Sequence, residues 1–258
     1  MIPSERIKEI TDILYQQKTV SVKELCKILY CSPSTIRRDL IDLEEAGVLR
    51  RTRGGATLVS KNTTEFSSYI RSLENSKEKQ TVASMATEFI HDDMSIFMDS
   101  SSTVHFICDY LYKYKNLIII TNSILVPNKL MNHDDLRVFC TGGVLKRHTY
   151  SLVGDMSYAF VKNYKPDICF FSCKAIDPSG IYEADYQQTN VKKNMLANAS
   201  KVILLVDSSK FEDSAFIAIS DLSNVDMILT EKKPENFTKF SPEQREKFVW
   251  PGRYPIKD

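Results

Sequence analysis

The chain has 258 residues, 43% of them hydrophobic, and its 34 Lys and Arg face 33 Asp and Glu, for a formal net charge of +1. This length and apolar content suffice for one large domain or two smaller domains with buried cores. The near-neutral total excludes a polybasic protein that binds nucleic acid by bulk charge, and it excludes an acidic disordered tail. A small basic patch is compatible with these numbers, so the distribution of charge along the chain is more informative about nucleic-acid binding than the total.

The first residues mix acids with bases and contain no long apolar run, which is not typical of a signal peptide. No stretch approaches the roughly 20 apolar residues that a membrane span needs. The cysteines form no CxxC pair and lie in or beside apolar segments, as buried thiols do in a reducing compartment. We therefore expect a cytoplasmic protein with no membrane partner. The cysteines are Cys26, Cys31, Cys108, Cys140, Cys169 and Cys173.

Residues 1–60 carry 10 basic and 8 acidic side chains, so this part has a charge of +2 and the remainder a charge of −1. After Lys27, every basic residue up to position 60 is an arginine. Arginine is the side chain best suited to bidentate contacts with phosphate and guanine. The composition of this segment therefore favours a small DNA-binding module.

Three helices are predicted in this segment. Ser4 is a candidate N-cap for the first. Ser21 and Glu24 have the spacing of a capping box, which opens a second helix. Ser32 is predicted to cap a third helix, with Pro33 at its favoured first position. The second helix is expected to bury Val22, Leu25, Ile28 and Leu29.

The third helix is predicted to bury one face and to present the other to solvent. Its apolar side chains recur with helical periodicity, and hydroxyls and arginines fall on the opposite side, with Arg37 on a flank. Residues 48–53 and 56–59 are predicted to be two short strands joined at Gly54–Gly55, a basic hairpin that serves as a wing. The candidate DNA-binding residues are Ser32, Ser34, Thr35, Arg37, Arg38, Arg50, Arg51 and Arg53.

The acidic residues of the third helix bear on how much of it is predicted to face DNA. Acidic side chains at Asp39, Asp42, Glu44 and Glu45 indicate that only the N-terminal half of the third helix faces DNA. The alternative interpretation is a three-helix subdomain whose arginines are merely solvated. Helix-turn-helix spacing is a moderately specific signal, and it favours DNA binding.

Three motifs in this segment resemble the N-terminal signature of the DeoR family of bacterial repressors. They are TIRRDL at 35–40, LEEAG at 43–47 and RGGA at 53–56. The resemblance implies a winged helix-turn-helix, with residues 20–39 as the helix-turn-helix and residues 33–47 as the recognition helix.

The polar segment that follows the hairpin marks a predicted domain boundary. We expect a DNA-binding domain over 1–59, a linker over 60–75, an α/β domain over 76–232, and a tail over 233–258 of unclear assignment. Short continuous apolar runs in the α/β domain are typical of strands buried on both faces of a mainly parallel sheet. The runs are residues 94–98, 117–120, 136–140, 168–171, 202–206 and 227–229.

Small polar residues follow each of these runs at once. Open α/β sheets bind ligands beyond the carboxyl ends of their strands, so these turns are expected to converge on one crevice. Hydroxyls and free amides suit a phosphate, Lys210 supplies a charge, and the carboxylates of Asp99 or Asp207 suit sugar hydroxyls. The alternative is that these are ordinary loops and helix caps. The candidate effector-binding residues are Asp99, Ser100, Ser101, Ser102, Thr103, Thr121, Asn122, Gly142, Gly143, Asp207 and Lys210.

The resemblance to the DeoR family continues through this half of the chain. Residues 99–103, 121–123, 142–143 and 207–211 are similar to the family's D-S-G-T-T, T-N-S, G-G and D-S-S-K-F motifs. It implies a sensor domain related in fold to ribose-5-phosphate isomerase that binds a sugar phosphate or similar metabolite. Ser101 stands where the family usually has Gly, so we expect a loop less free to adopt a positive φ angle. Gln188 stands in place of a frequent Glu.

An enzyme related to sugar-phosphate isomerases is the alternative function. Asp99, Asp167 or Asp207 could serve as its base, but no catalytic motif accompanies them. His105 and Cys108 have the helical spacing of metal ligands but lack a second pair, so we expect neither a metal nor another cofactor. The sequence predicts a DNA-binding regulator rather than an enzyme. We expect a repressor of a carbohydrate-utilisation operon that is released from operator DNA by a phosphorylated sugar and acts as a homo-oligomer, a dimer or tetramer.

Overall fold

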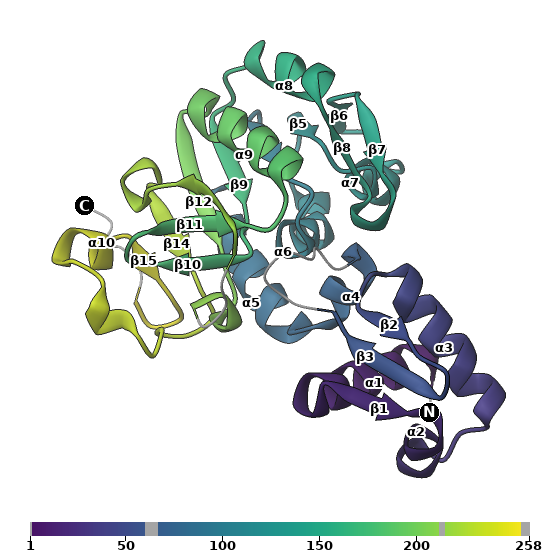
Figure 1. Cartoon of the computed structure of the whole chain (residues 1–258). Coiled ribbons are helices and arrows are strands. Elements are labelled where there is room, and N and C mark those ends of the chain that lie inside the picture. Colours follow the sequence, from purple (N-terminus) through teal and green to yellow (C-terminus); the bar gives the residue numbers. More distant parts are fainter. Residues whose placement is uncertain (1, 60–66, 212–214, 254–258) are drawn as a thin grey trace. The chain divides into compact units, whose positions relative to one another are not determined.

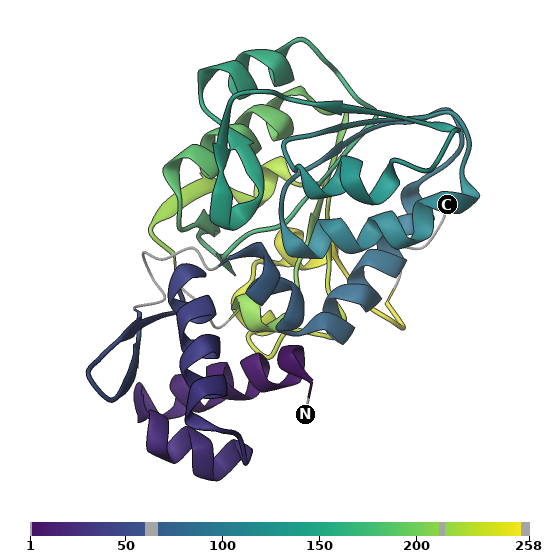
Figure 2. The same ribbon diagram turned by 90° about the vertical axis from the view of Figure 1, so that its right-hand side faces the viewer.

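The computed structural model describes residues 2–59, 67–211 and 215–253. The chain divides into two compact units, residues 1–74 and 75–258. Figure 1 shows the elements of both, and Figure 2 gives a view turned by 90°. Each unit has its own hydrophobic core and is described by itself.

The first unit is a winged helix-turn-helix, as predicted. Its three strands form an antiparallel sheet in the order β1-β3-β2, and the β2–β3 hairpin is the wing. Strand β1 was not predicted, because three residues are too few for an alternating pattern to stand out. The elements are α1 (Pro3–Gln17), β1 (Thr19–Ser21), α2 (Val22–Leu29), α3 (Pro33–Glu45), β2 (Leu49–Arg51), β3 (Gly55–Leu58) and α4 (Ser68–Leu73).

The predicted caps of α2 and α3 are confirmed. Ser21 Oγ accepts the Glu24 N–H at 3.1 Å, and the Glu24 carboxylate accepts the Ser21 N–H at 2.9 Å. Ser32 Oγ accepts the Thr35 N–H at 3.2 Å, with Pro33 as the first helical residue. These local hydrogen bonds satisfy backbone donors that a helix start leaves open, and they fix where the helix-turn-helix begins.

Two expectations for the helices are wrong. Helix α1 begins at Pro3 with Ile2 at the N-cap position, so Ser4 lies inside the first turn; proline is well suited to start a helix. Ile28 is 46% exposed, although its apolar character suggested burial. Leu25 and Leu29 occupy the core-facing line of α2, and Ile28 lies on its flank.

Helix α4 lies within the range that the sequence analysis assigned to a linker. Its Ile70 is 3% exposed and belongs to the hydrophobic core of the first unit. The first unit therefore extends to Glu74. The remainder of the expected linker, residues 60–66, lies outside the described residues.

The second unit is built on a seven-stranded sheet in the order β15-β14-β12-β9-β4-β5-β6, in which every neighbouring pair is parallel. The predicted mainly parallel α/β fold is therefore confirmed, and six of its strands fall on the predicted apolar runs. The seventh, β15, lies in the tail of unclear assignment. The strands are β4 (Ser95–Met98), β5 (Leu117–Thr121), β6 (Leu136–Cys140), β9 (Ile168–Phe171), β12 (Lys201–Leu205), β14 (Met227–Leu229) and β15 (Phe248–Val249).

Both faces of this sheet are buried, which explains the continuous apolar runs. Successive residues of β4 enter opposite cores: Phe97 joins one cluster, and Ile96 and Met98 join the other. Helices α5, α6 and α7 contribute to the second cluster, and α8 and α9 to the first (Figure 1). The helices are α5 (Ser76–Ala86), α6 (Ser102–His105), α7 (Leu125–Leu130), α8 (Asp155–Lys162), α9 (Tyr186–Asn198) and α10 (Pro242–Glu246). Short 3₁₀ helices cover Thr87–Phe89, Phe106–Lys113, Arg147–Thr149, Ser208–Phe211, Leu222–Asn224 and Phe237–Lys239.

Two antiparallel additions to this unit were not predicted. Gly142 and Gly143 adopt positive φ angles of 69° and 106° at the turn that precedes β7. A Cβ atom on Gly143 would lie 2.5 Å from the Val153 carbonyl oxygen, so this position requires glycine. The additions are a hairpin of β7 (Val144–Lys146) and β8 (Ser151–Val153), and a sheet of β10 (Ala175–Asp177), β11 (Gly180–Glu183) and β13 (Ile217–Ser220).

None of the helices in the described parts of the chain has the length and apolar character that a membrane crossing requires. All six cysteines are free thiols.

Candidate functional site

Three hydroxyl groups gather at the start of α3. Ser32 Oγ lies 2.8 Å from Ser34 Oγ and 2.9 Å from Thr35 Oγ1. The first turn of α3 contains no acidic residue, so the positive end of its dipole is unopposed. This end of the helix is therefore suited to approach an anionic group.

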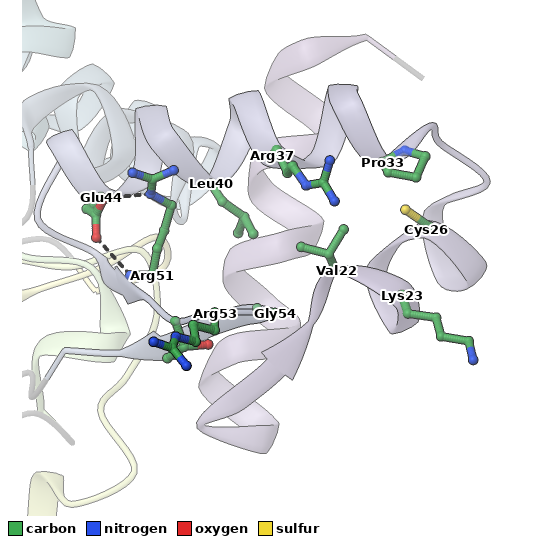
Figure 3. Close-up of a pocket in the computed structure, with 12 residues that line it drawn as sticks. Val22, Lys23, Cys26, Pro33, Arg37, Leu40, Glu44, Arg51, Arg53 and Gly54 are labelled. Atoms are coloured by element: carbon green, nitrogen blue, oxygen red, sulfur yellow. Dashed lines mark hydrogen bonds and ion pairs between the residues drawn. The ribbon is translucent and has the colours of Figure 1, made fainter.

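The faces of α3 are those predicted from its periodicity. Ile36 and Leu40 are buried, whereas Ser34 and Arg38 lie on the solvent side, opposite them. Arg37 is exposed on the flank that faces the wing (Figure 3). Arg38 and Ser34 are thus exposed side chains on the face of α3 opposite the core.

A groove of about 750 Å³ lies between the helix-turn-helix and the wing (Figure 3). Four cations and one carboxylate line it together with backbone and apolar groups. Lys23 was not among the predicted DNA-binding residues, although it belongs to this groove. The lining residues are Val22, Lys23, Cys26, Pro33, Arg37, Leu40, Glu44, Arg51, Thr52, Arg53, Gly54 and Gly55.

The wing presents its arginines in two ways. Arg51 shares the inner face of β2 with the buried Leu49 and forms an ion pair with Glu44 at 2.6 Å. Arg50 alternates to the other face of the strand, and Arg53 lies in the turn. Within residues 2–59, neither Arg50 nor Arg53 has an ion-pair partner, and the same is true of the two α3 arginines.

One acidic residue of α3 is not on the surface as expected. Asp39 is 2% exposed and receives two hydrogen bonds from Arg6 of α1, at 2.5 and 2.9 Å. These hydrogen bonds raise the pKa of Arg6. The pair fastens α1 to α3, so Asp39 does not repel an approaching phosphate in the way that an exposed carboxylate would.

In the second unit, Asp99 is enclosed by protein donors. Its Oδ1 accepts the backbone N–H of Ser101 at 3.0 Å and the Ser101 hydroxyl at 2.5 Å. Its Oδ2 accepts the Ser172 N–H at 3.3 Å and lies 3.3 Å from Lys192 Nζ. A carboxylate offers about four lone-pair sites, so Asp99 has none left for a ligand. It shapes the loop after β4.

Beside Asp99, a buried polar network joins four segments of the chain. Gln188 Oε1 accepts the Ser100 hydroxyl at 3.2 Å, and its Nε2 donates to Thr149 Oγ1 at 3.3 Å and to Ser151 Oγ. Asn122 Nδ2 donates to Ser100 Oγ at 3.3 Å. Asn122 is 1% exposed, and its Oδ1 has no hydrogen-bond partner in the described parts of the chain. An unpaired buried acceptor is a place for a ligand donor.

A second unpaired acceptor lies at the end of β12. Asp207 Oδ1 accepts hydrogen bonds from Asn75 at 3.1 Å and from the Ser209 N–H at 3.2 Å, whereas Oδ2 is buried and has no hydrogen-bond partner among the residues that the structure describes. Burial opposes ionisation, but the nearby Lys210 and Lys79 outweigh it, so the pKa of Asp207 lies below its ordinary value. Asp207 is therefore a carboxylate with one open oxygen.

The loop after β4 adopts an ordinary negative φ angle at Ser101. Ser101 has a φ angle of −72°, and its hydroxyl accepts the Val104 N–H at 3.3 Å. A positive φ angle is not needed there, so serine fits as a helix cap. Ser102 and Thr103 are buried, and their hydroxyls form no hydrogen bond within the described residues. Thr121 is buried at the end of β5.

Lys192 was missed by sequence reasoning. Its side chain is 5% exposed, and its ammonium group contacts Asp99 and Glu183 and donates to the Ser172 carbonyl at 2.8 Å. Burial opposes its charge, but the two carboxylates outweigh it and raise the pKa of Lys192. One cation thus compensates two buried carboxylates directly beneath the loop after β4.

Thr149, Ser151 and Glu183 were also missed, because no local pattern marks them. Gln188 had been singled out in the sequence only for its difference from a frequent Glu. No group of three or more His, Cys, Asp or Glu within the described residues could hold a metal ion.

Two family descriptions match the chain. Residues 6–62 match the "DeoR-like helix-turn-helix domain", and residues 74–232 match the "DeoR C terminal sensor domain". The chain is similar to the glycerol-3-phosphate regulon repressor of Escherichia coli (strain K12), with 31% identity over 235 residues, which cover 91% of this chain and 93% of that protein. It is also similar to the L-fucose operon activator of Haemophilus influenzae, with 32% identity over 229 residues, which cover 87% and 91%.

Among solved structures, ribose 5-phosphate isomerase A from Methanocaldococcus jannaschii matches with a TM-score of 0.39 and 18% identity, over 54% of this chain and 55% of that one.

Proposed function

Because the chain belongs to the DeoR family of DNA-binding transcriptional regulators, we propose that it represses a carbohydrate-utilisation operon and leaves operator DNA when a phosphorylated sugar or related metabolite binds. The protein is a regulator and not an enzyme. The direction of control is part of the proposal, because one relative is named a repressor and another an activator.

The observation that carries the DNA-binding part is the cationic groove between α3 and the wing. When a recognition helix enters the major groove and a wing reaches the minor groove, the sugar-phosphate strand between them crosses this groove. Arg37 and Arg53 are positioned along it to meet phosphates, together with Lys23. Arg50 and Arg51 are assigned to phosphates as well.

The base-edge contacts are assigned to the outward face of α3. Arg38 and Ser34 are exposed on this face, and Thr35 and Ser32 lie at the start of the helix, where their hydroxyls cluster with that of Ser34. Short hydroxyls near a helix N-terminus suit close approach to phosphates and base edges, and an arginine suits a guanine.

The effector is assigned to the carboxyl edge of the parallel sheet. Lys210 and the hydroxyls of Ser102 and Thr103 suit a phosphate group. The unpaired oxygens of Asn122 and Asp207 suit the hydroxyl donors of a sugar. We assign Ser100, Ser101, Thr121, Gly142, Gly143 and Asp99 to the walls and turns that shape this edge.

The active species is proposed to be a cytoplasmic homo-oligomer, a dimer or tetramer. Cytoplasmic placement agrees with a DNA target and with six free thiols. One winged helix offers a modest contact area, so paired modules give useful operator affinity. Large apolar side chains are exposed on and beside the edge strand β6, at Phe139 (40%), Val144 (66%) and Leu145 (46%). Light scattering with the Val144→Asp variant tests this surface, which is expected to yield a smaller species.

The test of effector control is a DNA-binding titration. A labelled duplex, enriched from random DNA by selection on the full-length protein, is titrated in the presence of a panel of sugar phosphates. Linkage requires that the active effector lower DNA affinity. Asp207→Asn should abolish this response and retain basal DNA binding, whereas Asp155→Asn, an exposed match on α8, should respond normally.

Two outcomes contradict the proposal. If no sugar phosphate alters DNA affinity, the effector class is wrong. If deletion of the gene lowers expression of the target operon instead of raising it, the protein is an activator.

A further inference from the structure

Glu44 makes the direct side-chain connection between the recognition helix and the wing. It lies in the last turn of α3, and its Oε1 accepts the backbone N–H of Arg51 at 2.8 Å. Its Oε2 accepts Arg51 Nε at 2.6 Å (Figure 3). Both oxygens of one carboxylate are thus directed at a single residue of the wing.

Stability does not explain this contact well. The Arg51 and Glu44 side chains are 44% and 35% exposed, and exposed ion pairs add little to the free energy of unfolding. The wing is also held at other points: the Val22 N–H donates to the Gly54 carbonyl at 2.8 Å, and β3 pairs with β1. The hairpin therefore stays attached to the unit without Glu44.

Charge alone does not explain it either. Among the described residues, Glu44 is the single acidic residue that lines the groove of the first unit, where four cations meet. A carboxylate in a groove that receives a phosphate strand weakens the attraction for DNA. A neutral residue at this position would serve better if the groove acted only through its charge.

The bonding pattern supplies the explanation. Glu44 occupies Nε of the Arg51 guanidinium, and the two terminal nitrogens have no hydrogen-bond partner within residues 2–59. A carboxylate on one edge of a guanidinium fixes its plane and leaves the other donors directed outward. The long side chain is then already ordered before DNA arrives. The pKa of Glu44 is lowered by its hydrogen bonds to Arg51, so it stays ionised at neutral pH.

We propose that Glu44 is a positioning residue for DNA binding, which holds Arg51 at the wing end of the groove so that its terminal nitrogens meet a backbone phosphate. The gain from an ordered arginine exceeds the repulsion between Glu44 and DNA. This inference rests on the DNA-binding function.

The test compares two variants whose effects on DNA affinity are expected to differ in direction. Glu45 is the next residue on α3, is exposed, and has the same charge, but it forms no hydrogen bond or ion pair with a wing residue within the described parts of the chain. Glu44→Ala and Glu45→Ala therefore remove the same charge from the same helical turn. Simple electrostatics predicts that both variants bind DNA as tightly as the wild type or more tightly.

The positioning role predicts a split between them. Glu44→Ala should weaken binding about three- to tenfold, the order expected when one long side chain must be immobilised on binding. Glu45→Ala should bind equally well or up to about twofold more tightly. Arg51→Ala should lower the slope of log affinity against log salt by about 1. In the Arg51→Ala background, Glu44→Ala should no longer weaken binding.

Affinities are measured by fluorescence anisotropy on the selected duplex at several salt concentrations, and thermal unfolding is recorded for each variant. Glu44→Gln, which keeps an amide oxygen as acceptor, should fall between wild type and Glu44→Ala and guards against a folding defect. The inference is overturned if Glu44→Ala binds as tightly as the wild type, or if it weakens binding equally with and without Arg51. Selection that enriches no duplex would overturn the DNA-binding function itself.

Discussion

The two units of this protein hold their polar groups in opposite ways. In the first unit, the candidate DNA contacts are mostly exposed side chains between residues 23 and 53, on α2, α3 and the hairpin that follows them. In the second unit, most of the candidate ligand groups are buried, with Gly142, Gly143 and Lys210 as the exceptions, and they come from segments spread between residues 99 and 210. The first arrangement acts through charges in water, which salt screens. In the second, removal of one group leaves its partner charged or unpaired out of water.

The largest effect on the free energy of unfolding is expected at the buried Lys192. Lys192→Met leaves Asp99 and Glu183 buried without their shared cation and should lower the free energy of unfolding by about 3–5 kcal/mol. Urea denaturation monitored by circular dichroism measures this change. Lys193→Met removes the same charge from the exposed neighbouring position and should cost less than about 0.5 kcal/mol. Equal losses in the two variants would contradict the buried triad.

A smaller effect, on binding instead of folding, is expected at Arg38. Arg38→Ala should cost about 1–3 kcal/mol on the selected duplex and relax base preference at one position, because the side chain lies opposite the core face of α3. Thermal unfolding should be unchanged. Competition with a scrambled duplex checks the assignment: an equal loss on both duplexes identifies a phosphate contact instead of a base contact.

The sequence separation of interacting residues explains which features of the structure the sequence could predict. Caps connect residues three apart, so Ser21 with Glu24 and Ser32 with Thr35 are visible in a short window, and both form. Buried parallel strands are continuous apolar runs, which is why six were found. A strand of two residues, such as β15, carries no such pattern.

Contacts between distant residues leave no local pattern. Gln188 meets Ser100 across 88 residues of sequence, and Arg6 meets Asp39 across 33. Acidic residues on α3 look alike in the sequence, but Asp39 is buried and Glu44 lies in the groove. The expected topology predicted which residues lie at the carboxyl edge of the sheet. The direction in which each carboxylate points depends on side-chain packing, which only the folded chain determines.

A third prediction concerns the N-terminal cap of α3 in the first unit. Ser32→Ala removes the cap of α3 and should lower the free energy of unfolding by about 1 kcal/mol. Ser34→Ala, an exposed serine two residues later that does not cap the helix, should cost less than about 0.5 kcal/mol. Chemical denaturation of both variants provides the comparison. If Ser34→Ala proves the more destabilising, the hydroxyl cluster and not the cap stabilises this helix start.

The smallest expected effect is a pH dependence of the free energy of unfolding that arises in the second unit. His105, at the end of α6, has a buried Nδ1 that forms no hydrogen bond within residues 2–59, 67–211 and 215–253. Burial, with a further contribution from Lys129 and against that of Asp109, lowers the pKa of His105. As pH falls below about 6.5, the histidine of the unfolded chain takes up a proton before that of the folded chain. The free energy of unfolding should therefore decrease as the pH falls from about 6.5 toward the lowered pKa of the folded protein.

Urea denaturation at pH 7.5 and pH 5.5 measures this loss, which His105→Leu should reduce. His91→Leu is the control, because His91 is exposed at the start of the segment before β4, and it should keep the pH dependence of the wild type. If His105→Leu loses as much stability on acidification as the wild type, other buried groups of the second unit take up the protons.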